Sequence, residues 1–227
     1  MTPPTAPASP HPPVRTFKRR AGRVTTTQRE ALDDLWPRFG RLVDGAPLDL
    51  PELFGRSAPV LLEIGFGMGD ATAELAAADP GRDVLAVDIH TPGQGNLLKL
   101  LDAHELTNVR VLDGDARRLL REMLGTASLA GVQVFFPDPW PKQRHVKRRL
   151  VDDAFADLVA GRLADDGVLH VATDMPHYAA QAREVLDRHP LLEPMTAPWR
   201  PTTKYELRGR AAGRPPHDLA ARRVPRC

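Results

Sequence analysis

The stretch Leu61-Leu-Glu-Ile-Gly-Phe-Gly-Met-Gly-Asp70 decides the fold. Residues 60–64 form an apolar run of strand length, and the glycines after it let the chain turn sharply into a helix with exposed backbone N–H groups. The spacing is G-x-G-x-G and not the G-x-G-x-x-G of dinucleotide-binding proteins, with Asp70 where a third close-packing glycine is wanted. The stretch predicts a ligand at the carboxyl end of a parallel strand.

The alternation of strand and helix patterns continues along the chain. The predicted strands are residues 60–64, 84–88, 109–112, 132–136 and 168–172, and the helices that follow them are 69–78, 96–105, 117–124, 150–163 and 177–188. Five such units with near-continuous apolar strands predict an α/β fold, a Rossmann-like, mostly parallel twisted sheet with helices on both faces.

The flanking regions follow other patterns. Residues 27–39 have helical spacing, with Thr27 as the expected N-cap and Pro37 at the end of the periodic run, and residues 204–208 resemble a last, irregularly placed strand. We divide the chain into a disordered Pro-rich leader at residues 1–14, one domain with a basic N-terminal arm at 15–210, and a basic C-terminal tail at 211–227.

Composition narrows the class of protein. The chain of 227 residues has one cysteine, Cys227, so it cannot form an intramolecular disulfide, and it shows neither a membrane-spanning run nor a secretory signal. We expect a cytoplasmic protein, as a monomer or a homodimer.

Residues 1–23 and 204–227 each carry a net charge of +5, while 24–203 carry −8. Clustered basic groups are typical of nucleic-acid binding, although charge runs are often plain solvated surface.

Acidic residues stand in or just after four successive predicted strands: Glu63, Asp88, Asp115 and Asp138. Asp88 lies 23 residues after Gly65, about where an acid that binds a ribose diol belongs in a nucleotide-binding sheet. Asp115 can accept a hydrogen bond from an adenine amino group, and Glu63 can accept from an ammonium group or a hydroxyl. These acids suit adenosine with an amino-acid tail better than pyrophosphate, because like charges repel.

The segment Phe135-Phe-Pro-Asp-Pro-Trp-Pro-Lys142 fixes Asp138 between two prolines at the end of an apolar strand. The basic run Arg144-His-Val-Lys-Arg-Arg149 follows and suits phosphate contacts, as does the arm at residues 15–23. Trp140 and Tyr205 are candidate stacking surfaces for an unpaired base, but Trp140 is interpreted first as a packing residue that seals the strand end. His90 and His145 have no second ligand at a useful spacing, so we expect no metal.

These motifs resemble the class I S-adenosylmethionine-dependent methyltransferases. The same resemblance is carried by residues 22–28, residues 90–95, Thr173-Asp174 with Tyr178, and Thr203-Lys-Tyr-Glu206 with Arg208-Gly209. Within that class they resemble the bacterial tRNA (guanine-N7-)-methyltransferase family. The resemblance covers residues 15–209. Asp88 stands where that family often has Glu, the prolines around Pro141 and Pro176 vary from its commoner pattern, and Met175 stands where it often has an aromatic residue.

The resemblance implies that the chain binds tRNA and methylates N7 of the guanine at position 46 in the variable loop, with S-adenosylmethionine as donor and S-adenosylhomocysteine as product. It implies Asp138 as the catalytic residue. A fixed carboxylate would stabilise the positive charge that spreads over the purine, and on that ground Asp174 is the second candidate. The residues implied in cofactor binding are Glu63, Gly65, Gly67, Asp88, Asp115 and Asp138. Those implied in substrate binding are Lys142, Asp174, Thr203, Lys204, Tyr205 and Glu206. Those implied in RNA binding are Arg144, His145, Val146, Lys147, Arg148 and Arg149.

Two other functions remain open at this point. A nicotinamide-dependent oxidoreductase uses the same kind of sheet, but the missing third glycine and the acid-lined cofactor edge count against it. A non-catalytic tRNA-binding module would share the basic clusters, but every acid of the family motifs is present.

Overall fold

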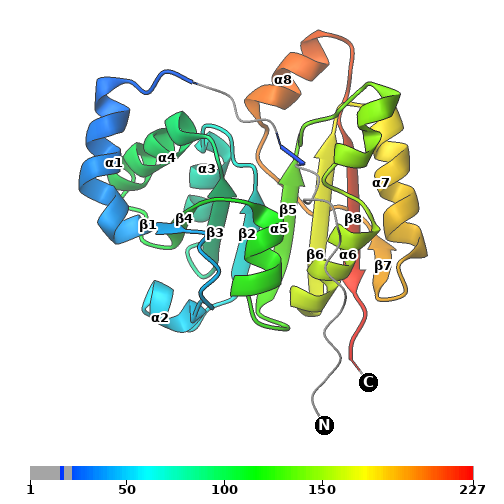
Figure 1. The fold of residues 1–227 in the computed structure, drawn as a ribbon, viewed down its shortest axis with the longest axis horizontal. Helices are drawn as coiled ribbons and strands as arrows, with labels where there is room; N and C mark the ends of the chain where they lie inside the picture. The colour runs from blue at the N-terminus through cyan, green and yellow to red at the C-terminus, as the bar shows by residue number, and fades with distance from the viewer. Residues whose placement is uncertain (1–15, 18–21, 227) are drawn as a thin grey trace.

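The computed structural model describes residues 16–17 and 22–226 and contains one eight-stranded sheet in the order β1-β4-β3-β2-β5-β6-β8-β7 (Figure 1). The first six strands in that order pair in parallel, whereas β8 runs antiparallel to both β6 and β7. The predicted mostly parallel sheet is confirmed. The strands are β1 (Gly40–Leu42), β2 (Val60–Ile64), β3 (Asp83–Asp88), β4 (Val109–Asp113), β5 (Leu129–Phe135), β6 (Leu163–Thr173), β7 (Leu192–Met195) and β8 (His217–Arg223).

Helices cover both faces of the sheet, each with its own apolar cluster. On one face α1, α3 and α4 bury residues such as Leu97 and Leu101 against the β3 and β4 side chains, and on the other face η1, α6 and α7 pack against Leu62, Leu85 and their neighbours. The helices are α1 (Thr26–Phe39), α2 (Leu50–Phe54), α3 (Asp70–Ala78), α4 (Thr91–Ala103), α5 (Ala116–Arg118), η1 (Leu119–Met123), η2 (Gln143–Arg148), α6 (Asp153–Arg162), α7 (Pro176–Arg188) and α8 (Lys204–Ala211).

The strand order reverses direction between β2 and β5. From β2 the chain adds β3 and then β4 on one side, and it then returns to place β5 on the other side of β2 and β6 beyond it. At such a reversal the loops after the two neighbouring strands diverge and leave a crevice at their carboxyl ends, where open α/β sheets bind ligands. The glycine loop after β2 and the Pro-Asp-Pro segment after β5 both begin there.

Several predicted elements need correction. Residues 204–208, predicted as a strand, begin α8, because Thr203 caps its first turn by accepting a hydrogen bond from the Glu206 N–H at 3.1 Å. Residues 217–223 form β8, so the segment predicted as a tail contributes a strand between β6 and β7. Elements β1, α2, η2 and β7 were not predicted. Residues 1–14, the predicted leader, lie outside the described residues.

Helix boundaries also differ from the prediction. The α1 N-cap is Thr25 and not Thr27, and it forms a capping box with Gln28, while Pro37 lies inside the helix. Helix α4 begins at Thr91, five residues before the predicted start, with Pro92 in its first turn.

The early start of α4 brings its first turn against the glycine loop. A Cβ atom added to Gly93 would lie 1.8 Å from the carbonyl oxygen of Gly67, a distance that only movement of the backbone could relieve. Gly67 itself has a φ of 61°, in the left-handed region that glycine adopts without strain. The shape of the loop therefore depends on the absence of a side chain at residue 93.

We predict that Gly93→Ala lowers the stability of the fold by about 1–3 kcal/mol, because overpacking pushes α4 away from the glycine loop. Gly161→Ala is the matched control: this glycine also lies in a helix, and a Cβ there meets nothing within 4 Å. The control should be neutral or stabilise by about 0.5–1 kcal/mol. Urea unfolding of both variants measures the two effects, and equal stabilities would contradict the proposed contact.

Candidate active site

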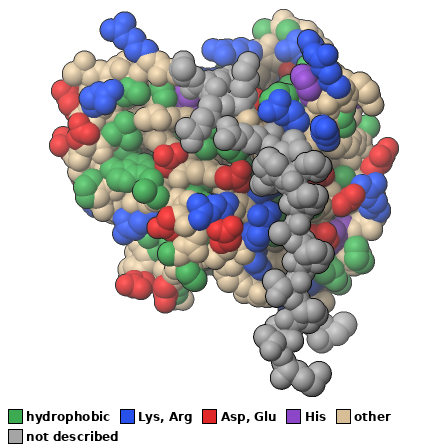
Figure 2. Space-filling model, in the orientation of Figure 1, with side chains coloured by type: hydrophobic (Ala, Val, Ile, Leu, Met, Phe, Trp, Pro, Cys, Tyr) green, Lys and Arg blue, Asp and Glu red, His purple; other side chains and the backbone are tan. Residues whose placement is uncertain are grey.

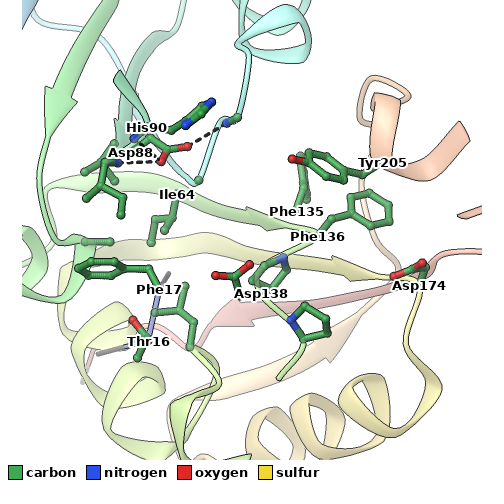
Figure 3. A pocket seen from close by; sticks show the side chains of 18 of the residues that line it. Thr16, Phe17, Ile64, Asp88, His90, Phe135, Phe136, Asp138, Asp174 and Tyr205 are labelled. Atoms are coloured by element: carbon green, nitrogen blue, oxygen red, sulfur yellow. Dashed lines mark hydrogen bonds between the residues drawn. The ribbon is translucent and has the colours of Figure 1, made fainter. Parts of the chain in front are cut away.

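A cavity of about 480 Å³ opens at the carboxyl edge of the sheet where the strand order reverses (Figure 3). One side of it comes from the ends of β2 and β3, and the other from the segment after β5 together with α8 and the loops beside it. The residues that line it are Thr16, Phe17, Ile64, Gly65, Gly67, Val87, Asp88, Ile89, His90, Gly114, Ala116, Phe135, Phe136, Pro137, Asp138, Pro139, Leu150, Asp174, Tyr205, Arg208, Gly209 and Arg214.

Asp88 organises the β2–β3 side of the cavity. One carboxylate oxygen accepts from the Gly67 N–H at 3.0 Å, and the other accepts from the N–H groups of Ile89 and His90 at 2.7 and 3.0 Å. Burial raises the pKa of Asp88, and these backbone donors partly offset the rise. The side chain that sequence spacing predicted as a ribose ligand therefore also ties the glycine loop to the end of β3.

Glu63 lies in β2 and does not line the cavity. In the sheet register it stands beside Gln133 of β5, which stands beside His170 of β6, so the three polar side chains form a row across one face. Each is buried and has one polar atom without a hydrogen-bond partner among the described residues: Glu63 Oε2, Gln133 Oε1 and His170 Nδ1. Buried polar atoms without a hydrogen-bond partner are uncommon in folded proteins, and a bound ligand is one way to supply the missing partner.

Asp138 lines the cavity on the β5 side and lies between its two halves in Figure 3. The residues around it hold a strained backbone: Phe136 has a φ of 50° and Trp140 a φ of 42°, values that side chains with a Cβ rarely adopt. The Phe136 N–H still donates to the Ala172 carbonyl at 2.8 Å, so the turn begins at a fixed point on β6. Strain of this type persists where surrounding contacts fix the chain, often at functional sites.

Trp140 has a packing role. Its indole Nε1 donates to the Thr16 carbonyl at 3.1 Å, its ring meets His145 edge-on, and the Arg148 guanidinium lies 3.9 Å from the ring centroid. These contacts connect η2 with the described part of the N-terminal arm, where Phe17 lines the cavity.

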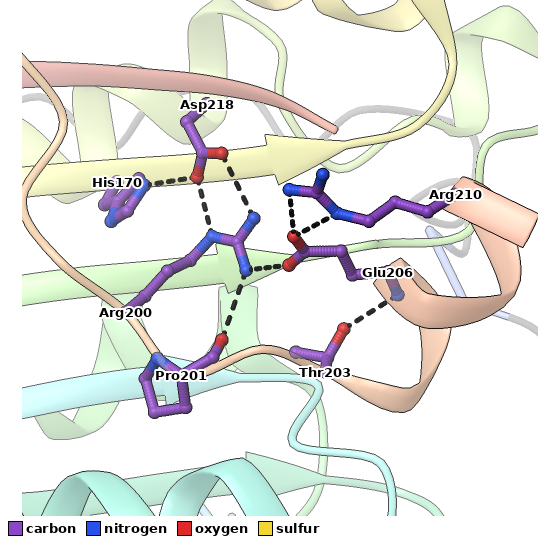
Figure 4. A network of polar contacts seen from close by, with 7 residues as sticks. All are labelled: His170, Arg200, Pro201, Thr203, Glu206, Arg210 and Asp218. Carbon is purple, nitrogen blue, oxygen red and sulfur yellow. Dashed lines mark hydrogen bonds and ion pairs between the residues drawn. The ribbon is translucent and has the colours of Figure 1, made fainter. Parts of the chain in front are cut away.

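Helix α8 carries several of the predicted substrate residues, with different surroundings. Tyr205 lines the cavity and is about half exposed. Lys204 forms an exposed ion pair with Asp70 at 2.9 Å, and Thr203 caps the helix. Glu206 is buried and accepts hydrogen bonds from two arginines (Figure 4).

Of the remaining predicted site residues, one lines the cavity and two lie outside it. Asp174 lines the cavity and pairs with Arg214 at 2.9 Å. Asp115 does not line it, since its carboxylate caps α5 by accepting from the N–H groups of Arg117 and Arg118. Lys142 is exposed outside the cavity, at the start of η2.

The predicted RNA-binding run forms η2 and its C-cap. Arg144 and Lys147 are exposed, His145, Val146 and Arg148 are half-buried, and basic side chains gather on the upper rim over α8 and η2 in Figure 2. Arg149 differs from them. It is buried, donates to the Pro139 carbonyl at 3.1 Å, and lies over the ring of Tyr178, whose pKa burial raises to about 12.

The sequence prediction missed the aromatic part of the cavity and one of its polar residues. Phe135 and Phe136 look like ordinary strand residues in sequence, and only the end of β5 shows that they face the ligand space. His90 was considered only as a metal ligand, whereas it lines the cavity next to Asp88. Among the described residues, no group of three or more His, Cys, Asp or Glu side chains is placed to hold a metal ion, and no helix is long and apolar enough to cross a membrane.

Comparison with known proteins assigns the family. A family model described as "Putative methyltransferase" matches residues 57–219. A tRNA (guanine-N(7)-)-methyltransferase of Streptomyces avermitilis is 53% identical over 220 residues, covering 93% of this chain and 76% of that protein. One of Nitrosospira multiformis is 48% identical over 221 residues, covering 95% and 96%.

Solved structures share the fold at low sequence identity. The 16S rRNA methyltransferase KamB aligns with a TM-score of 0.56 and 16% identity over 77% of this chain and 92% of that one. The chain therefore shares the Rossmann-like fold of that methyltransferase. With matches of this identity and coverage, the chain belongs to the tRNA (guanine-N(7)-)-methyltransferase family.

Proposed function

We propose that this chain transfers a methyl group from S-adenosylmethionine to N7 of a guanine in tRNA, at position 46 of the variable loop. The observation that carries the proposal is the composition of one cavity in a chain of this family. It joins the glycine loop and Asp88 on one side to Asp138, Asp174 and Tyr205 on the other. A donor and an acceptor can thus meet across a single space.

The residues present fit the methyl donor. Gly65 and Gly67 line the cavity without side chains, so a flat ligand can approach the backbone closely. Asp88 suits the hydroxyls of a ribose, and Ile64 and Val87 offer apolar surface to its base. Glu63 Oε2, buried behind the glycine loop and unbonded among the described residues, suits an ammonium group reached directly or through a water. When bound, S-adenosylmethionine supplies an electrophilic methyl group on a cationic sulfur.

The protein's main task is positioning. Guanine N7 has a free lone pair and attacks the methyl carbon directly, so no general base is required. Alignment of the reactants can supply roughly 7–11 kcal/mol of the barrier reduction. As the new bond forms, positive charge spreads over the purine, and a carboxylate held rigidly at its edge stabilises that charge. We assign this role to Asp138, with Asp174 as the second candidate.

Phosphate contacts would hold the tRNA. Arg144 and Lys147 are exposed on η2, next to the cavity segment that contains Asp138. Contacts of this kind give affinity without reading sequence, while the guanine is recognised in the cavity.

We predict that Asp138→Asn lowers kcat by about 100- to 1000-fold, because the amide retains the shape but not the charge. The dissociation constant for tRNA should change by less than about threefold, since other residues bind it. Asp187→Asn, an exposed change on α7, is the control. Single-turnover methyl transfer with labelled donor on unmodified tRNA measures the effect, and near wild-type rates would exclude the assignment.

The charge of Glu63 gives a prediction about pH. Burial raises its pKa from 4.5 to about 7, with a further rise from Asp88 and a partial offset from Thr72. The folded protein therefore keeps a proton that the unfolded chain has released, so this contribution to stability is full below pH 4.5 and is lost as pH rises through 7. The loss amounts to roughly 3 kcal/mol.

Accordingly, the unfolding free energy of Glu63→Gln relative to wild type should increase by roughly 2.5 kcal/mol between pH 5 and pH 8 without ligand. Wild-type affinity for S-adenosylhomocysteine should rise over the same range, because the ionised carboxylate attracts the ligand's ammonium group, and Glu63→Gln should remove that rise. Urea unfolding and calorimetry test the two parts. A pH-independent difference would mean that Glu63 does not titrate as proposed.

We predict that Arg144→Ala and Lys147→Ala each weaken tRNA binding and reduce the slope of log affinity against log salt by about 1. Arg82→Ala is the matched control, because this exposed arginine precedes β3 at the opposite edge of the sheet. Filter binding from 50 to 300 mM salt separates the variants. Equal slopes for all three would place the tRNA elsewhere.

A further inference from the structure

Arg200, in the loop between β7 and α8, joins three parts of the protein through one buried guanidinium group. Its Nε and Nη2 atoms donate to the two carboxylate oxygens of Asp218 in β8, at 2.6 and 3.1 Å, and Nη1 donates to Glu206 of α8 at 2.6 Å (Figure 4). Only 7% of the arginine side chain is exposed. Nη1 also donates to the Pro201 carbonyl at 3.2 Å.

The two carboxylates depend on this group. Although burial acts to raise it, hydrogen bonds from His170 and Arg200 hold the pKa of Asp218 well below its usual range. Burial also acts to raise the pKa of Glu206, but hydrogen bonds from Arg200 and Arg210 outweigh it, so this pKa is lowered too. Because an ionised carboxylate only accepts hydrogen bonds, the His170 Nε2 at 2.9 Å is the donor, which fixes that ring beside Arg200.

The third contact of Arg200 is with the cavity wall. Its guanidinium carbon lies 5.2 Å from the ring centroid of Phe135 and 5.5 Å from that of Phe136, and both residues line the cavity. A planar guanidinium can stack on rings and form paired hydrogen bonds with a carboxylate at the same time, and a lysine ammonium cannot. Arg200 itself does not line the cavity.

The first turn of α8 also approaches the glycine loop. A Cβ on Gly67 would lie 3.7 Å from the ring of Tyr205, the residue that precedes Glu206. Lys204 also connects α8 to Asp70, but both side chains are largely exposed, so that ion pair contributes little. The buried contact between Glu206 and Arg200 is the stronger constraint on where Tyr205 stands.

We infer that Arg200 is a positioning residue for the tRNA-facing half of the site: it joins the first turn of α8 to β8 behind Phe135 and Phe136, and so holds Tyr205 and the aromatic wall in the arrangement that receives the guanine. The inference rests on the proposed function. The cofactor-facing half, at the ends of β2 and β3, does not contact Arg200 through any of these bonds. Loss of the guanidinium should therefore impair use of tRNA more than binding of the cofactor.

The first test is Arg200→Lys, which keeps the charge but cannot satisfy both carboxylates and the two rings. We expect kcat/KM for tRNA to fall at least tenfold and backbone amide exchange in residues 204–211 to accelerate. The dissociation constant of S-adenosylhomocysteine should stay within threefold of wild type. The matched control is Arg222→Lys on β8, the strand that carries Asp218, where an exposed guanidinium pairs with Glu193. It should change none of the three measurements.

The second test is Asp218→Asn, which weakens the same group from β8 without altering a residue of the cavity wall. It should produce the same pattern at smaller size, with kcat/KM down three- to tenfold, and the double variant should be no worse than Arg200→Lys alone. If Arg200→Lys does not fold, Asp218→Asn decides alone. The inference is overturned if folded variants use tRNA like wild type, or if cofactor affinity falls by the same factor as kcat/KM. A wild-type protein that methylates no tRNA would instead refute the proposed function, while amide exchange would still report whether Arg200 holds α8.

Discussion

Parallel pairing of β2 with both β3 and β5 is the constraint on which the site depends. In the sheet register Glu63 pairs with Ala86 of β3 and with Gln133 of β5, so the three strands end at one edge of the sheet. The reversal of strand order then separates the loops that follow these strands. A one-residue slip would turn each side chain to the opposite face and break up the apolar clusters on both sides. The distance between the glycine loop and the Asp138 segment is thus set by the core.

Around that edge the protein departs in two ways from what favours a stable fold. Phe136 and Trp140 have backbone angles that favour glycine, and a row of buried polar side chains crosses β2, β5 and β6. Each departure has an energetic cost in the free protein, and each lies beside the cavity or directly behind it. A ligand that supplies a charge or a hydrogen bond to Glu63 would recover part of that cost, which couples cofactor binding to the stability of the sheet.

Sequence patterns predicted the elements whose causes are local. The strand Val60–Ile64 was predicted to the residue, because its apolar run ends at glycines, and Asp88 was placed at the cavity by spacing alone.

Other features depend on contacts distant in sequence. Helix α8 has few apolar residues, and its first turn is stabilised by Thr203 and by the contact of Glu206 with Arg200, which no periodicity reveals. Arg200 gave no signal, since its role arises only where β8, α8 and β5 meet. Asp115 and Glu63 were correctly placed at the ends of strands, but their side chains do not line the cavity.

The position of β8 has a consequence for the order in which the protein can assemble. Residues 217–223 are synthesised after every other strand, yet they lie between β6 and β7 and supply Asp218. Until they leave the ribosome, β6 presents an unpaired edge and β7 has no strand to join. The nascent chain can therefore pair β1 to β6 early, while Arg200 and α8 lack their partner Asp218 until residues 217–223 emerge. A nonsense or frameshift change at residues 212–217 would consequently leave an aggregation-prone product with an open edge on β6.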